Sequence, residues 1–236
     1  MTPEFHPEVA TDHRHLDLAE YDDAYVVGDV HGCADALDRL LSVLEVTDDD
    51  LVVFVGDLIR KGPRSDAVVE TVREADNMFS VRGNNEEKLL RGEKTVPSLS
   101  DDDAEWLQSL PVAISWAGGL VVHGGVDPRL PLETQTPEAL QNTRSVPSGA
   151  GYDGPFWYEG YEGPPRVFFG HTVLETPVET EWAVGLDTGC VYGGSLSAYD
   201  LRRERFYDVP AQVADRPRSE EKIVSPAATA KQYETG

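Results

Sequence analysis

Six side chains that favour divalent metal ions stand in five short, glycine-containing segments of this chain. They are Asp29, His31, Asp57, Asn84, His123 and His171. Carboxylate, imidazole and amide groups together suit manganese, iron, zinc or magnesium better than a metal that prefers thiolates. Glycine beside such ligands lets the backbone turn sharply next to an ion without a side-chain clash. The residue types therefore predict a metal site.

Each of the five segments directly follows a run of residues that is typical of a β-strand. Apolar runs at 25–30, 51–55 and 78–81 predict three strands. Between them, Leu37–Leu44 and Val68–Val72 carry apolar residues at the spacing of a helix with one buried face. This alternation predicts a parallel sheet, in which the carboxyl ends of the strands lie along one edge. We therefore expect the six side chains to meet at that edge.

The rest of the chain predicts a mixed α/β fold. Ser100 and Asp103 form a capping box for a helix that we expect to reach Leu110. Residues 112–122 predict a hairpin, and residues 142–165, rich in glycine, proline and aromatic residues, predict a long functional loop. Further strands are expected at 167–169, 184–186, 196–201 and 205–209. The expected organisation is a flexible arm at 1–22, one domain at 23–210 and a disordered tail at 211–236.

The segments match, in order, a set of family motifs. Gly28-Asp29-Val30-His31-Gly32 is the first and Gly170-His171-Thr172 the last, with Gly56-Asp57, Gly83-Asn84-Asn85-Glu86 and His123-Gly124-Gly125 between them. This series resembles the calcineurin-like metallophosphoesterases, in particular the phosphoprotein phosphatase branch with small prokaryotic Ser/Thr phosphatases and symmetrical diadenosine tetraphosphatases. The resemblance covers residues 25–202. It implies a metallophosphoesterase-type β-sandwich flanked by helices, in a single domain.

The resemblance also implies a role for each ligand. Asp29 and His31 would hold a first divalent ion, Asp57 would bridge two ions, and Asn84, His123 and His171 would complete the second site. Manganese is the expected metal, with iron, zinc or magnesium also compatible. Two ions about 3.5–4 Å apart acidify a water between them and bind the attacking and leaving oxygens. A metal-bound hydroxide would then attack the phosphorus atom.

Phosphate recognition points to basic side chains near these motifs. Arginine binds phosphate with two parallel donors, and Arg82 directly precedes Gly83. Arg144, in the long loop, is a second candidate. Lys61 stands where the family commonly has a phosphate-binding arginine. We expect Asp57, Arg82 and Asn84 to take a direct part in catalysis, and Arg82, Arg144 and Lys61 to bind the substrate phosphate.

Two departures from the family pattern concern proton transfer. The family commonly has Gly-Asp-x-x-Asp-Arg-Gly and Gly-Asn-His-Glu, whereas this chain has Arg60 and Asn85 at the Asp and His positions. In the protein phosphatases these two residues form a dyad whose histidine is thought to protonate the departing alkoxide. The chain keeps the metal ligands and lacks both members of the dyad. We therefore expect leaving groups that depart without a proton to be preferred.

Composition limits the partners of the protein. Its 236 residues carry 43 acidic and 20 basic side chains, a net charge of −23 that would repel a nucleic-acid duplex. The acid-rich, lysine-poor composition resembles that of proteins from salt-loving organisms. No apolar run has the length of a membrane span, and no signal peptide is visible, so we expect a cytoplasmic protein without a membrane partner. Cys33 and Cys190 form no CxxC pair, and we assign them no chemistry.

Three functions are compatible with these features. The first is a two-metal phosphatase that hydrolyses phosphomonoesters, with phosphorylated proteins as substrates. The second is a dinucleoside polyphosphate hydrolase with a nucleotide substrate, such as a symmetrical diadenosine tetraphosphatase. The third is a non-catalytic module that binds metal or phosphate. Trp157, Tyr158 and Tyr161 would favour the nucleotide if they stacked on a base, and they would not distinguish the functions if they only packed the loop.

Overall fold

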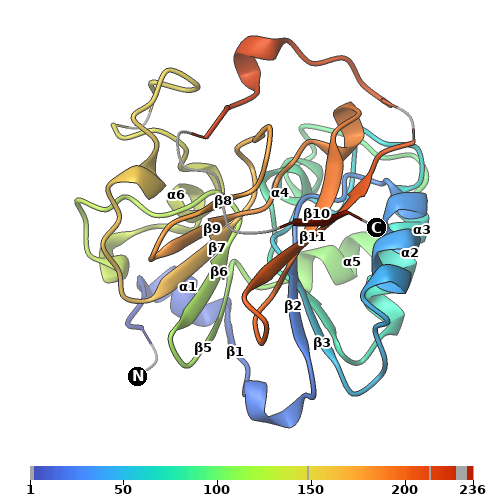
Figure 1. The fold of residues 1–236 in the computed structure, drawn as a ribbon, viewed down its shortest axis with the longest axis horizontal. Coiled ribbons are helices and arrows are strands. Elements are labelled where there is room, and N and C mark those ends of the chain that lie inside the picture. The colour runs from blue at the N-terminus through green and yellow to red at the C-terminus, as the bar shows by residue number, and fades with distance from the viewer. Residues whose placement is uncertain (1–2, 148, 213, 227–232, 236) are drawn as a thin grey trace.

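Two six-stranded sheets form the centre of the molecule (Figure 1). The computed structural model describes residues 3–147, 149–212, 214–226 and 233–235. The strand order is β1-β5-β6-β7-β9-β8 in one sheet and β12-β11-β10-β2-β3-β4 in the other. This is the β-sandwich flanked by helices that the sequence predicted.

The second of these sheets contains the predicted alternation of strands and helices. Strands β2 (Ala24–Val27), β3 (Leu51–Phe54) and β4 (Met78–Ser80) are parallel and are connected by helices α2 (Ala34–Val43) and α3 (Ser65–Glu74). Strand β10 (Ser195–Asp200) joins β2 antiparallel, and β11 (Arg205–Pro210) and β12 (Tyr233–Thr235) extend that edge. The carboxyl ends of β2, β3 and β4 therefore face the same way.

The first sheet is built around a hairpin. Strands β5 (Ala113–Trp116) and β6 (Gly119–Val122) pair antiparallel, and β7 (Arg166–Phe169) and β9 (Ala183–Gly185) continue the sheet parallel to β6. Strands β8 (Val178–Glu179) and β1 (His13–His15) lie at its two edges. The carboxyl ends of β6 and β7 thus point in one direction, like those of the parallel strands opposite.

Three hydrophobic cores hold these layers together. Side chains of both sheets, among them Val26, Val53, Phe168 and Val184, form the inner core. A second core lies between the β2–β4 sheet and the helices α2, α3 and α5 (Asp101–Ser109), and includes Leu37. The third packs helices α1 (Pro7–Thr11) and α6 (Pro137–Asn142) on the other sheet. Helix, sheet, sheet and helix therefore stack as four layers, with the strand ends open along one side.

The chain ends differ from the sequence-based expectation. Residues 1–22, expected to form a flexible arm, include α1 and β1, and β1 pairs parallel with β5. Val9 is fully buried in the core, so these described residues are part of the folded domain. The prediction of a flexible arm was wrong because it relied on periodicity, and the few apolar residues of this segment show none. A single buried side chain, Val9, is enough to attach α1 to the core.

The tail and the long loop are also partly ordered. Within 211–236, the described residues form the short helix η5 (Glu220–Lys222) and strand β12, while 213, 227–232 and 236 lie outside the described residues. Helix η3 (Trp157–Glu159) lies in the long loop, and Trp157 and Tyr158 are buried against Phe169. Their rings pack in the core and are not available to stack on a base. In the part of the chain that the structure describes, no helix has the length and apolarity needed to cross a bilayer.

Candidate metal centre

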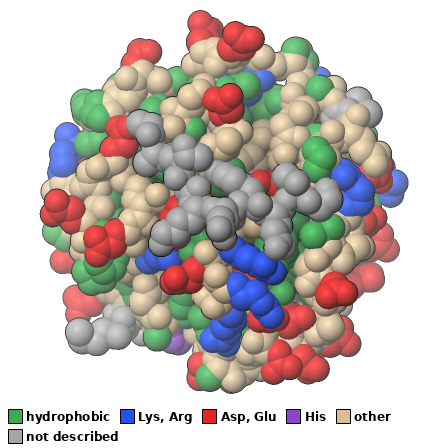
Figure 2. All heavy atoms as spheres, in the orientation of Figure 1, with side chains coloured by type: hydrophobic (Ala, Val, Ile, Leu, Met, Phe, Trp, Pro, Cys, Tyr) green, Lys and Arg blue, Asp and Glu red, His purple; other side chains and the backbone are tan. Residues whose placement is uncertain are grey.

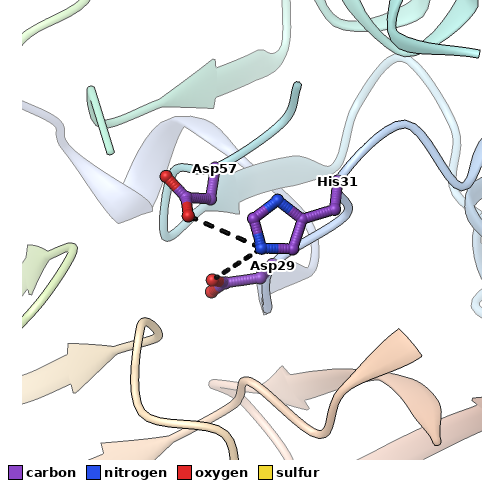
Figure 3. Close-up of side chains that lie close together, drawn as sticks. All are labelled: Asp29, His31 and Asp57. Carbon is purple, nitrogen blue, oxygen red and sulfur yellow. Dashed lines mark ion pairs between the residues drawn. The ribbon is translucent and has the colours of Figure 1, made fainter. Parts of the chain in front are cut away.

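The predicted ligands meet where the strands of the two sheets end. Asp29 and His31 follow β2, Asp57 follows β3, and one ligand atom from each lies within 4.8 Å of the others. His31 Nε2 lies 3.5 Å from Asp57 Oδ2 and 3.8 Å from Asp29 Oδ2 (Figure 3). All three side chains are buried. This part of the chain therefore forms a compact group of oxygen and nitrogen donors.

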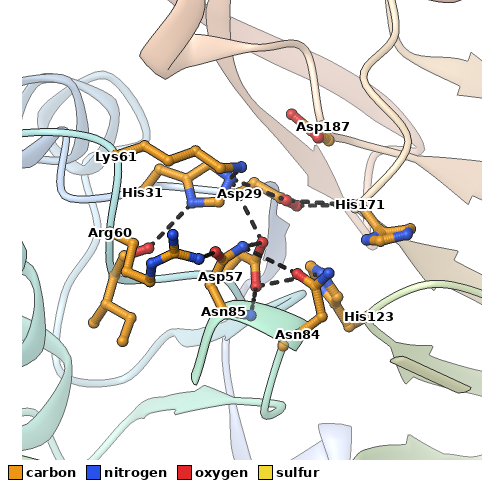
Figure 4. A network of polar contacts seen from close by, with 12 residues as sticks. Asp29, His31, Asp57, Arg60, Lys61, Asn84, Asn85, His123, His171 and Asp187 are labelled. Atoms are coloured by element: carbon orange, nitrogen blue, oxygen red, sulfur yellow. Dashed lines mark hydrogen bonds and ion pairs between the residues drawn. The ribbon is translucent and has the colours of Figure 1, made fainter. Parts of the chain in front are cut away.

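The other three predicted ligands lie on the side of Asp57 that is turned away from His31 (Figure 4). His123 follows β6, and its Nε2 lies 3.4 Å from Asp57 Oδ1. Its ring lies 5.2 Å from the ring of His171, which follows β7. Asn84 begins helix α4 (Asn84–Leu90), beside Asp57 (Figure 4). The two carboxylate oxygens of Asp57 thus face different histidines, which is the arrangement that the predicted bridging role requires.

Backbone carbonyls orient two of the histidines. Ile59 O lies 3.1 Å from Nδ1 of His31, and Val55 O lies 2.8 Å from Nδ1 of His123. With Nδ1 turned to a carbonyl, Nε2 is the nitrogen directed at Asp57, the usual arrangement of a metal-binding histidine. Burial acts to lower the pKa of His123, but Asp57 outweighs it and raises that pKa to about 9. His123 Nε2 is fully buried and makes no hydrogen bond. A buried polar atom without a partner is costly, so this nitrogen fits a ligand role.

The charges of the site also fit cations. Burial and the nearby Asp187 raise the pKa of Asp29 well above its usual range. Burial also acts to raise the pKa of Asp57, but His123 and His31 outweigh it and keep that pKa well below its usual range. Burial and then Lys61 lower the pKa of His31 to about 3, so its imidazole is neutral at pH 7. Buried carboxylates that repel one another, beside a neutral imidazole, form a donor set suited to divalent metal ions.

The backbone is strained at these positions. Among the described residues, seven that are not glycine have a positive φ, and five of them lie in this site: His31, Asp57, Arg60, Lys61 and His171. Such conformations cost of order 1–3 kcal/mol each and concentrate at functional sites. Gly170, which precedes His171, lies so close to Asp29 that no side chain fits there. A Cβ at position 170 would lie 1.9 Å from Asp29 Oδ1.

The residues at the two dyad positions contact each other. The guanidinium of Arg60 donates a hydrogen bond to Asn85 Oδ1. Asn85 in turn donates to both oxygens of Asp57, from its side-chain amide and, at 2.8 Å, from its backbone N–H. Neither group is an acid near neutral pH, because an amide does not ionise and arginine stays charged. The pair therefore orients Asp57 and has no proton to donate to a leaving group.

The predicted phosphate-binding residues lie in different places. Lys61 and Arg144 line the cavity, of about 310 Å³, that opens onto Asp29, Asp57, Asn84 and His171. Lys61 Nζ lies 2.6 Å from His31 Nε2, the nitrogen that would bind an ion. Arg144 donates to the carbonyl oxygen of His171 at 3.2 Å, and its buried Nε has no partner.

Arg82 does not line that cavity. Its guanidinium pairs with Asp12 at 3.1 Å and Glu87 at 3.2 Å, and donates to the carbonyl of Gln108 at 2.9 Å. These contacts connect the N-terminal segment, α4 and the end of α5. The prediction that Arg82 binds phosphate and takes part in catalysis is therefore not supported by its position, and its contacts are those of a residue that stabilises the fold. The motif position predicts phosphate binding, whereas the side chain in this structure is directed at Asp12 and Glu87.

Several cavity residues were missed in the sequence. Asp187, which follows β9, is buried and lines the same cavity as Asp29, Asp57 and His171 (Figure 4). Its signal was available, because Asp187 and Gly189 follow a predicted strand just as the other motifs do. Lys88, Lys94, Tyr152 and Arg218 also line the cavity. No motif marks these four, since a loop, a helix face and the C-terminal segment bring them to the site.

Comparisons with known proteins agree with this geometry. The family model of the calcineurin-like phosphoesterases matches residues 24–182. The chain is 26% identical to an asymmetrical bis(5'-nucleosyl)-tetraphosphatase of Halalkalibacterium halodurans, over 79% of this chain and 93% of that protein. It is also 26% identical to a symmetrical bis(5'-nucleosyl)-tetraphosphatase of Vibrio cholerae, over 79% of this chain and 98% of that protein.

A solved structure is also similar. The crystal structure of a protein provisionally described as a diadenosine tetraphosphatase superposes with a TM-score of 0.76 at 30% identity, covering 85% of this chain and 98% of that one. Fold, motif order and family model all agree. The chain belongs to the calcineurin-like phosphoesterases and is a metal-dependent phosphoester hydrolase.

Proposed function

We propose that the protein hydrolyses dinucleoside polyphosphates, cutting a phosphoanhydride whose leaving group is a nucleotide. The sequence alone placed phosphomonoesters first and this substrate second. The relatives reverse that order, because the two described above act on bis(5'-nucleosyl) tetraphosphates by name. One of these relatives is an asymmetrical and the other a symmetrical hydrolase. The proposal therefore does not specify which phosphoanhydride bond is cut.

The charge of the cavity is the observation that carries this proposal. Six of the 20 lysines and arginines line this one cavity: Arg60, Lys61, Lys88, Lys94, Arg144 and Arg218. The chain as a whole carries −23, and Figure 2 shows acidic side chains spread over the face drawn there. A monoester brings one phosphate, which the metal ions and two basic groups would neutralise. Cations in this number suit a chain of several phosphates.

The metals would supply the activation of water and the neutralisation of charge at the phosphate under attack. We propose Asp29, His31, Asp57, Asn84, His123 and His171 as the ligands of two divalent ions, with manganese as the metal. Asn85 holds Asp57 in place through two hydrogen bonds. Lys61 and Arg144, on the cavity wall, would bind phosphate oxygens and so align the substrate.

The pair at the dyad positions supports the same substrate. A serine alkoxide is a strongly basic leaving group and benefits from an acid, whereas the terminal phosphate oxygen of a nucleotide departs without a proton. Arg60 provides a positive charge where the protein phosphatases have a carboxylate. This positive charge favours binding of the negatively charged polyphosphate. Cleavage of an anhydride does not require the general acid that this chain lacks.

A substrate panel tests this proposal. Manganese-loaded protein is given diadenosine tetraphosphate, a phosphoserine peptide and an aryl phosphate, and kcat/KM is measured for each, with products separated by ion-exchange chromatography. We expect diadenosine tetraphosphate to exceed the peptide by at least about 100-fold, the lower end of what an acid contributes. A higher kcat/KM for the peptide would restore the phosphomonoester function. Metal-loaded protein that turns over none of the three would indicate the non-catalytic module.

A further inference from the structure

The C-terminal segment, residues 214–225, runs beside the metal centre and lies outside the part matched by the family model. At its start, Arg216 donates from its backbone to Val191 O at 3.1 Å and from Nε to Lys61 O at 3.0 Å. Near its end, Val224 exchanges backbone hydrogen bonds of 2.8 Å with Val173 and Glu175. The segment passes over the strand ends as an extended stretch around η5 (Figure 1). Both of its attachments are thus within a few residues of site residues.

Between these attachments, the segment directs one arginine into the cavity. Arg218 is half-buried and lines the same cavity as Asp29, Asp57 and His171. Its Nε donates to the carbonyl of Lys222 at 2.8 Å, within the segment. Its Nη2 donates to the hydroxyl of Tyr152. None of these contacts is with a carboxylate, so the described partners leave the positive charge without an acidic neighbour in contact.

A second arginine lies across the same tyrosine ring. The guanidinium carbon of Arg144 lies 4.3 Å from the centroid of Tyr152, and that of Arg218 lies 5.4 Å from it. Arg218 also lies 4.6 Å from the centroid of Tyr192, and Lys61 Nζ lies 5.3 Å from that ring. Three cations and two tyrosine rings are therefore linked by cation–π contacts along one wall of the site.

The proximity of these charges has an energetic consequence. Burial lowers the pKa of Arg144, and the neighbouring Arg218 lowers it further. Like charges held close in a partly buried place repel one another, and an anion between them relieves that repulsion. Cation–π contacts with the rings offset part of the cost and do not themselves use the N–H groups at the edges of the guanidinium planes. The wall is thus organised for an anion with several oxygens.

A larger cavity continues the charged wall. It has a volume of about 580 Å³, shares Arg60 and Lys61 with the metal cavity, and is also lined by Arg216. The C-terminal segment therefore contributes one arginine to each of two adjoining cavities. A single phosphate at the metal centre would fill only part of this space.

We propose that Arg218 is a substrate-binding residue that contacts a phosphate next to the one under attack, and that the C-terminal segment thereby selects polyphosphate chains over phosphomonoesters. This inference rests on the proposed function for its natural substrate. Its physical content, a preference for linked phosphates, is tested without that substrate. The family-matched domain would provide the hydrolytic centre, and the added segment would provide the selectivity.

Inhibition by inorganic phosphates tests the role of Arg218. Tripolyphosphate and orthophosphate are used as competitive inhibitors of aryl phosphate hydrolysis by the manganese-loaded protein, and calorimetry measures tripolyphosphate binding independently. In Arg218→Ala we expect tripolyphosphate to bind about 10–100-fold more weakly, the usual worth of a hydrogen bond to a charged group. Orthophosphate inhibition should weaken by less than about threefold, so the ratio of the two inhibition constants is the readout. Arg218→Lys keeps the charge without the two-pronged donors, so its tripolyphosphate affinity should lie between those of the parent and Arg218→Ala.

Lys222→Ala is the matched control. It removes the same charge from the same segment, but Lys222 is exposed and Arg218 contacts only its backbone carbonyl. Its tripolyphosphate affinity should equal that of the parent. Amide exchange at Val224, whose N–H donates to Val173, shows whether the segment stays attached in Arg218→Ala.

Three results would overturn the inference. The first is an unchanged tripolyphosphate affinity in Arg218→Ala, and the second is an equal weakening of tripolyphosphate and orthophosphate inhibition. The third is a loss of tripolyphosphate affinity only in variants whose Val224 amide exchanges rapidly with solvent. The last would mean that Arg218 only anchors the segment. Failure of the proposed function is separate: the parent would then leave diadenosine tetraphosphate intact while Arg218→Ala still lost tripolyphosphate selectively.

Discussion

Restoring a proton donor at the dyad positions should change which leaving groups the enzyme tolerates. The double substitution Arg60→Asp with Asn85→His replaces two side chains that contact each other, one of which donates to Asp57. In the parent neither side chain can give up a proton at neutral pH. An imidazole at position 85, oriented by a carboxylate at position 60, would have one.

The size of the effect follows from two opposing contributions. A positioned general acid contributes about 10²–10⁴-fold when the leaving oxygen is strongly basic. Removing the hydrogen bond of Asn85 to a charged Asp57 and the cation Arg60 costs about tenfold or more for every substrate. We therefore expect phosphoserine kcat/KM to rise by about 10–10³-fold. Aryl phosphates, whose phenolate departs readily, and diadenosine tetraphosphate should show only the loss.

The assay is a series of phosphate esters of graded leaving-group pKa, measured for the parent, both single variants and the double variant. The logarithm of kcat/KM should fall steeply with leaving-group pKa in the parent and less steeply in the double variant. Each single variant should keep the parent slope, because neither completes the dyad. A parent slope near zero, with chemistry shown to limit turnover, would refute the reasoning and mean that another residue supplies the proton.

Three further predictions concern the metal ligands, the fold and the surface. Asp57→Asn should lose more bound metal and more turnover than Asn84→Ala, because Asp57 faces both His31 and His123; equal metal content by elemental analysis would contradict the bridging role. Arg82→Ala should cost about 1–3 kcal/mol of stability, lowering Tm by several degrees while KM stays within about twofold, and a large rise in KM would return Arg82 to the substrate site. Tm should rise from low to molar KCl as repulsion across the −23 surface is screened; a flat or falling Tm would count against a halophilic origin.

Periodicity predicted the elements whose burial follows a regular pattern. The strands before Asp29 and Asp57 and the helices around them agree with β2, β3, α2 and α3 to within a few residues. Strand β1 and helix α1 could not be predicted in this way. Strand β1 is an edge strand of three residues, none of them buried, and α1 contributes one buried side chain, Val9. Their order depends on pairing with residues about 100 positions away.

The site residues also differ in whether local sequence or distant contacts place them. Asp29, Asp57 and His123 each stand within three residues of the end of a strand, so a local motif was sufficient to single them out. Arg82 also lies in a motif, yet its side chain turns toward Asp12 and Glu87, a direction that the sequence does not encode locally. Arg218 reaches the cavity from a segment without periodicity, and only tertiary contacts bring it there.

Metal dependence is the most direct test of the account. The protein is stripped with a chelator, its metal content is measured by elemental analysis, and Mn²⁺ is returned stepwise while hydrolysis of diadenosine tetraphosphate is followed. We predict negligible activity in the stripped protein and a rise that is complete when about two ions per chain are bound, as a two-metal centre requires. Full activity in protein shown to contain almost no metal would contradict the metal centre built from Asp29, His31, Asp57, Asn84, His123 and His171.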